Sequence, residues 1–107
     1  MTDTSMLIKE MWDNAMDVGY VIFKLSSMKT PATFENIIKE PLLKDKTREQ
    51  VKKALEALDY TGHINFHDST FIADKYIRVF GLNYPDCFEG YAKLKGWIET
   101  PAPKFLI

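Results

Sequence analysis

Two histidines and one cysteine are the side chains of this sequence best suited to hold a metal ion. His63 and His67 stand in the stretch GHINFHDSTFIAD, and Cys87 lies well beyond them. Residues four positions apart along a strand are separated by roughly 13 Å, too far for one ion bound at about 2 Å. We therefore expect no metal and no cofactor. Instead, His63 is expected to face Asp74 across a hairpin, with His67 in the turn.

Catalysis has little support in the sequence. An enzyme site needs a nucleophile with its base, an isolated pair of carboxylates or a glycine-rich phosphate loop, and the sequence has no convincing example of these. Cys87 with a distant histidine is a weak pair, because a lone cysteine is more often a packing residue. We expect a protein that is not an enzyme.

Basic side chains gather in the middle of the chain. Between Lys39 and Lys53, six basic residues stand against three acidic ones. At the start of a helix such side chains can contact phosphate, and the helix can enter the major groove of DNA. The residues expected to bind duplex DNA are Lys44, Lys46, Thr47, Arg48, Lys52 and Lys53, with Arg48 the candidate for reading a base edge. The alternative is a solvated face held by Glu49–Lys53 and Lys52–Glu56 pairs at i,i+4 spacing.

Three helices are predicted to position these residues. Apolar residues at helical spacing predict a first helix from Ser5 to about Lys24, with a stripe wide enough to be covered on more than one side. A short helix follows over 34–40, capped by Thr33 and stopped by Pro41. The third helix, 48–60, starts at a capping box of Thr47 and Gln50, buries Val51, Ala54, Leu55 and Leu58, and ends before Gly62.

A β-hairpin is predicted directly after the third helix. With its turn at Asp68 and Ser69, Ile64 pairs with Ala73 and Phe66 pairs with Phe71 on one apolar face. The alternation in 76–80 is consistent with another strand.

The last part of the chain predicts one more helix and an extended tail. Asp86 and Glu89 have the spacing of a capping box, and Phe88, Tyr91 and Leu94 would form the inner face of the helix. The tail 97–107 is expected to be extended. The aromatic and apolar residues expected to bind a partner protein are Tyr84, Trp97, Phe105 and Leu106.

Composition is that of one small globular domain. The chain has 107 residues, 46% of them hydrophobic, and a net charge of −1, so no global field attracts nucleic acid. One cysteine, no leader pattern and no span of bilayer length suggest a cytoplasmic protein without membrane contact. We expect a single domain over 1–107, with a core module over 1–80 and the C-terminal helix and tail over 81–107.

The order of three helices and a hairpin is that of an α+β winged helix, in which the third helix reads DNA and the ribbon is the wing. The runs MKTPATFENIIKEPLL, TREQVKKALEAL and TGHINFHDSTFIAD resemble the winged-helix module of bacterial RNA polymerase delta subunits and HARE-HTH domains. Positions that carry this resemblance are Lys29, Pro31, Phe34, Ile37 and Gly62.

Two functions follow as expectations. The first is a non-catalytic DNA-binding protein, a small bacterial or phage regulator associated with transcription. The alternative is a winged helix that binds a protein, for which the resemblance implies RNA polymerase or another host protein. A homodimer through residues 5–25 or through the C-terminal tail would double the basic patch.

Overall fold

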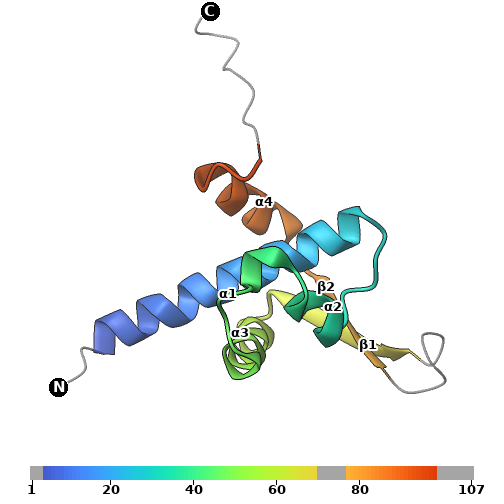
Figure 1. Cartoon of the computed structure of the whole chain (residues 1–107), viewed down its shortest axis with the longest axis horizontal. Coiled ribbons are helices and arrows are strands. Elements are labelled where there is room, and N and C mark those ends of the chain that lie inside the picture. Colours follow the sequence, from blue (N-terminus) through green and yellow to red (C-terminus); the bar gives the residue numbers. More distant parts are fainter. Residues whose placement is uncertain (1–3, 70–76, 99–107) are drawn as a thin grey trace, which may run out of the picture.

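Over the residues that the structure describes, the protein is an α+β domain of four α-helices and a two-stranded antiparallel hairpin. The computed structural model describes residues 4–69 and 77–98, with residues 4–8 described by their backbone alone. In chain order the elements are α1 (Thr4–Ser27), α2 (Phe34–Ile38), a 3-10 turn (Pro41–Leu43), α3 (Arg48–Tyr60), β1 (Ile64–Ser69), β2 (Ile77–Leu82) and α4 (Pro85–Leu94), as Figure 1 shows.

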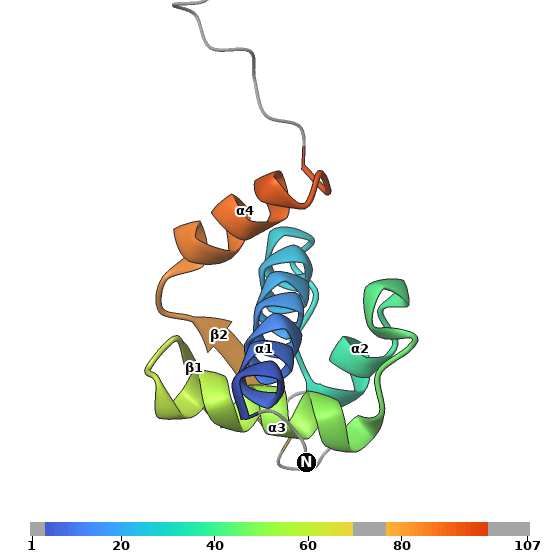
Figure 2. The ribbon, with the colours of Figure 1, turned by 90° about the vertical axis from the view of Figure 1, so that its left-hand side faces the viewer.

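Helix α1 is the centre of the fold. Figure 2 shows it nearly end-on, with α4 on one side and α3 on the other. Its buried hydrophobic residues are Ala15, Val18, Val21, Ile22 and Leu25. The prediction that this helix is covered on more than one side is confirmed, and its observed bounds lie close to the predicted 5–24.

Local sequence signals set the bounds of α2 and α3. The Thr33 hydroxyl accepts the backbone N–H of Asn36 and caps α2, as predicted. Both hydrogen bonds of the predicted capping box are present at α3, where Thr47 and Gln50 each bond the other's backbone N–H. Gly62, at φ 76°, follows the end of α3 in the left-handed conformation that glycine tolerates best. The predicted bounds of α3 and its four predicted buried residues are confirmed.

The pairing of the hairpin differs from the prediction. Ile64 lies opposite Leu82 and Phe66 opposite Phe80, so β2 is the return strand and the predicted pairs with Ala73 and Phe71 are wrong. His67 lies inside β1 rather than in a turn. Phe71, Ala73 and Asp74 themselves lie outside the described residues. Because the true return strand begins later, the connection between the strands is longer than the tight turn predicted at Asp68 and Ser69.

The segment between α1 and α2 adds a short pairing to this ribbon. Thr33 forms an antiparallel bridge with Val79, and the backbone N–H of Phe80 donates to the carbonyl of Ala32. The start of α2 is thereby fixed beside β2, so that α2, α3 and the hairpin surround one space.

Helix α4 forms, but its start and its inner face differ from the prediction. Tyr84 is the N-terminal cap position, so Asp86 lies in the first turn and does not cap the helix. Phe88 is fully buried, with its ring against Gly19 of α1, whereas Leu94 is 90% exposed. The burial of Phe88 was predicted, whereas Leu94 was also expected to face inward and Ala92 is buried instead. Within the described residues, no helix is long and apolar enough to cross a membrane.

Candidate functional site

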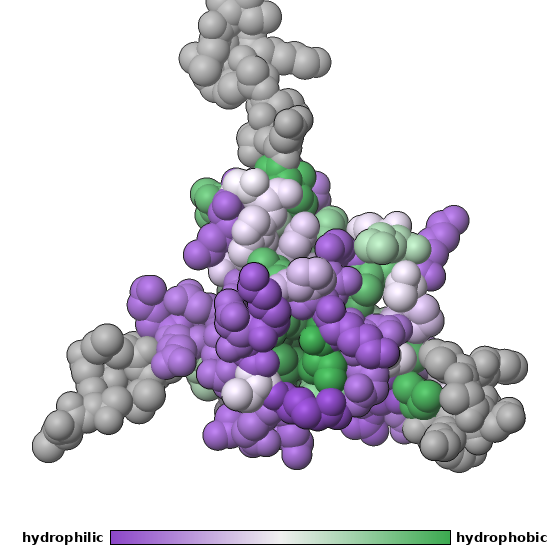
Figure 3. All heavy atoms as spheres, in the orientation of Figure 1, coloured by the Kyte–Doolittle hydropathy of each residue, from purple (hydrophilic) through white to green (hydrophobic). Residues whose placement is uncertain are grey.

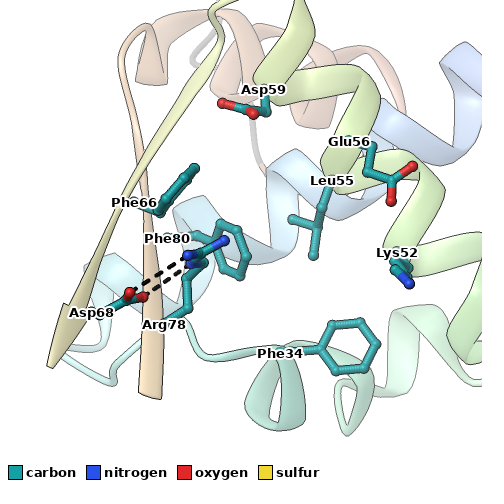
Figure 4. A pocket seen from close by; sticks show the side chains of 9 residues that line it. All are labelled: Phe34, Lys52, Leu55, Glu56, Asp59, Phe66, Asp68, Arg78 and Phe80. Carbon is teal, nitrogen blue, oxygen red and sulfur yellow. Dashed lines mark hydrogen bonds and ion pairs between the residues drawn. The ribbon is translucent and has the colours of Figure 1, made fainter. Parts of the chain in front are cut away.

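A hollow of about 550 Å³ lies between α2, α3 and the hairpin. Its apolar lining comes from four elements: Phe34 of α2, Leu55 of α3, Phe66 of β1 and Phe80 of β2. Figure 4 shows these side chains around one space, and Figure 3 shows apolar surface between α3 and α2, enclosed by hydrophilic side chains. Phe66 is 42% exposed, and its ring meets that of Phe80 edge to face at 6.2 Å.

Charged side chains surround this apolar lining. Lys52, Glu56 and Asp59 come from α3, and Asp68 and Arg78 come from the two strands. Three acids against two bases give the lining a formal charge of −1. A lining of this sign does not attract the phosphates of a nucleic acid.

The pair Asp68–Arg78 fixes the hairpin side of the hollow. Arg78 Nε donates to Asp68 Oδ1 at 3.0 Å, and the guanidinium lies 4.0 Å from the centre of the Phe66 ring. The hydrogen bond from Arg78 lowers the pKa of Asp68, and the same bond raises the pKa of Arg78. Arg78 therefore neutralises the charge of Asp68 and holds the Phe66 ring in place. These two contacts make the Arg78 guanidinium less available to bind a phosphate.

Lys46 and Thr47, expected to bind DNA, are engaged within the fold. Lys46 Nζ donates to Asn14 Oδ1 at 2.6 Å and pairs with Asp17 Oδ2 at 3.2 Å, and its side chain is 17% exposed. The Thr47 hydroxyl caps α3. Both residues hold the start of α3 in place.

Arg48, the expected base reader, is exposed but paired. Its Nη2 lies 2.7 Å from Glu35 Oε1, and its guanidinium lies 5.2 Å from the centre of the Phe34 ring. The hydrogen bond from Arg48 lowers the pKa of Glu35. To reach a base, Arg48 would have to leave this carboxylate.

Lys44, Lys52 and Lys53 remain the exposed bases of the expected DNA site. In the part of the chain that the structure describes, none of the three forms an ion pair, and the i,i+4 pairs proposed as the alternative are not formed. Lys52 lines the hollow beside the hairpin, whereas Lys53 lines a second hollow beside α1. Helix α3 as a whole has no net charge, because it has three basic and three acidic residues.

The histidines have neighbours other than those predicted. His63 Nδ1 lies 2.6 Å from the Thr61 hydroxyl, and the ring packs edge to face against Tyr84 and Phe88. Its predicted partner, Asp74, lies outside the described residues. Over residues 9–69 and 77–98, no three potential metal ligands come together.

The residues expected to bind a partner lie apart. Tyr84 is 60% exposed, whereas Trp97, 36% exposed, packs on the rings of Tyr20 and Tyr91 at centroid distances of 5.1 and 5.5 Å. Phe105 and Leu106 lie outside the described residues.

The hollow was not predicted because Phe66 was paired with Phe71 and not with Phe80. Leu55 is buried as predicted, whereas Phe66, expected on the apolar face of the hairpin, is 42% exposed. Pairing Phe66 with Phe80 instead of Phe71 was the signal that could have found the site, since it puts two aromatic rings beside α3.

Comparison of the chain with protein-family models, with curated proteins and with solved structures finds no match. The resemblance to delta-subunit modules therefore stays a prediction.

Proposed function

We propose that the protein is a non-catalytic winged-helix module that binds a segment of another protein in the hollow between α3 and the hairpin. The observation that carries this proposal is the convergence of Phe34, Leu55, Phe66 and Phe80 on one open space. Phe66 is exposed and Phe34 and Phe80 are half-buried, whereas Leu55 is buried. An open apolar hollow with a polar rim is typical of a binding site.

The arrangement of elements supports a winged helix. The chain runs α1, the bridge at Thr33, α2, α3, β1 and β2, and Thr33 pairs with the second strand of the ribbon. A winged helix has this order, with α3 as the helix that reads DNA and the β1–β2 ribbon as the wing. In that frame the hollow lies between the reading helix and the wing.

The chemistry of the hollow favours an apolar anchor with a basic neighbour. Phe66 and Phe80 offer aromatic surface to a large apolar side chain. Glu56 and Asp59 are exposed acids without an ion pair among the described residues, so a Lys or Arg beside that anchor would meet unneutralised charge.

A peptide selection tests this function. Peptides selected from a random library on the full chain are expected to carry an aromatic or aliphatic anchor with Lys or Arg nearby. Phe66→Ala should weaken their binding about tenfold or more, because truncating a central anchor costs at least about 1.4 kcal/mol. Tyr60→Ala is the matched control, since Tyr60 is 92% exposed at the end of α3 and does not line the hollow. Peptides that bind Phe66→Ala as tightly as wild type would contradict the proposal. Purified bacterial RNA polymerase is one further probe, suggested by the resemblance.

Duplex DNA is the second candidate, favoured by Lys44, Lys52 and Lys53, which are exposed and unpaired within the described residues. If DNA is bound through α3, affinity should fall steeply with salt and should be lost in Lys52→Glu/Lys53→Glu, because phosphate contacts release counterions. No binding at low salt, or binding indifferent to the charge reversal, would exclude this candidate.

A further inference from the structure

The apolar stripe of α1 continues beyond the part of the helix that the domain covers. Ala15, Val18, Ile22 and Leu25 are buried, but Met11 on the same helical face is 40% exposed. Sequence spacing extends this face by one more turn to Leu7 and Ile8. Figure 1 shows this end of α1 projecting past α3 and α4.

A second hollow, of about 310 Å³, lies where the projecting part of α1 meets α3. Met11 and Ala54 give it an apolar centre, and Asn14 and Gln50 contribute amide groups. Its two charged groups are Glu10 from α1 and Lys53 from α3. In the described part of the chain, neither of these two forms an ion pair.

We propose that this surface binds a second copy of the chain in a two-fold dimer, with the two α1 helices antiparallel and crossing at Met11. In a two-fold interface the same patch faces itself, so it must complement its own charges. One acid and one base beside an apolar centre meet this condition, because Glu10 of each copy faces Lys53 of the other. A partner with charges of one sign, such as a nucleic acid, would place a like charge opposite either Glu10 or Lys53.

The crossing also covers the rest of the stripe. Residues that precede Met11 in one copy come beside those that follow it in the other, since the helices run in opposite directions. Asn14, which lines the second hollow, then lies beside the turn of the partner's α1 that precedes Met11. The face that the domain leaves open is thereby closed by the same face of its partner.

Charge exchange tests the dimer. In sedimentation equilibrium the full chain is expected to be dimeric, and Glu10→Lys or Lys53→Glu alone should raise the dimer dissociation constant about tenfold or more, since each places like charges together. The double variant Glu10→Lys/Lys53→Glu should restore the wild-type constant, because the exchanged charges again pair.

Lys52→Glu is the matched control, because Lys52 is the neighbouring lysine and lines the other hollow. It should leave the dissociation constant unchanged. A wild-type chain that stays monomeric at the highest soluble concentration would overturn the proposal. Single variants that dimerise like wild type would overturn it too, and so would a double variant that fails to restore the dimer.

Discussion

Gly19 is the residue on which the packing of α4 depends most directly. A Cβ atom at this position would overlap the ring of Phe88, which is fully buried. The absence of a side chain at Gly19 thus lets α4 lie close against α1. Gly90, on α4 itself, has no such role, because a methyl group at this position would have no neighbour within 4 Å.

Alanine at the two glycines should therefore change stability in opposite directions. Gly19→Ala should lower the free energy of unfolding by about 1–3 kcal/mol through overpacking. Gly90→Ala should raise it by about 0.5–1 kcal/mol, because alanine loses less conformational freedom in a helix. Urea denaturation of both variants measures the difference. A Gly19→Ala chain as stable as wild type would show that α4 does not pack as described.

The ion-pair partners of individual residues could not be predicted from the sequence. The basic cluster around α3 was visible, but nothing in the local pattern indicates that Lys46 reaches Asp17 or that Arg48 reaches Glu35. Both acids come from earlier helices, so these partners depend on the tertiary arrangement. Lys52 and Lys53 were expected to form one patch and instead line two hollows.

Among the elements, the helix defined by local sequence signals was predicted correctly, whereas the long-range pairing of the strands was not. The capping box at Thr47 and the glycine at 62 define α3 because both act through backbone groups within a few residues. The hairpin offered two return segments with similar alternation, 71–73 and 77–82, and period-two spacing does not determine the loop length between strands. The candidate site depended on that choice.

A polar group shared by three segments joins α4 to the rest of the fold. Tyr91 donates its hydroxyl proton to Asp17 Oδ1 at 2.8 Å, and Lys46 pairs with the other oxygen of the same carboxylate. Burial, with the hydrogen bond to Asp17, raises the pKa of Tyr91 above its ordinary value. The folded chain thus holds this proton more tightly than the unfolded chain.

This difference predicts a loss of stability in alkali. The contribution of Tyr91 is complete below the ordinary tyrosine pKa of about 10, and it decreases as the pH rises from there through the raised pKa of the folded chain. Tyr91→Phe should be less stable than wild type by about 0.5–1.5 kcal/mol at neutral pH, with the gap narrowing above about pH 10. Tyr60→Phe is the control, because Tyr60 is 92% exposed. Parallel pH profiles of urea denaturation for wild type and Tyr91→Phe would contradict this role of the hydroxyl.

At the scale of the whole molecule, the two hollows lie on different flanks of α3. The larger one faces α2 and the hairpin, and the smaller one faces α1. A dimer through α1 would therefore leave both copies of the larger hollow open. Two identical sites in one dimer would strengthen binding to a partner that presents the target segment twice.

Binding of a protein segment in the hollow beside the hairpin is a proposal that a peptide titration can test. Amide chemical shifts of the full chain, followed by NMR while a selected peptide is added, test it most directly. We expect the largest shifts at Phe34, Leu55, Phe66 and Phe80, and we expect Phe66→Ala to reduce the shifts of the other three at the same peptide concentration. Shifts confined to Lys44, Lys53 and Tyr60, or shifts of equal size in Phe66→Ala, would contradict the claim.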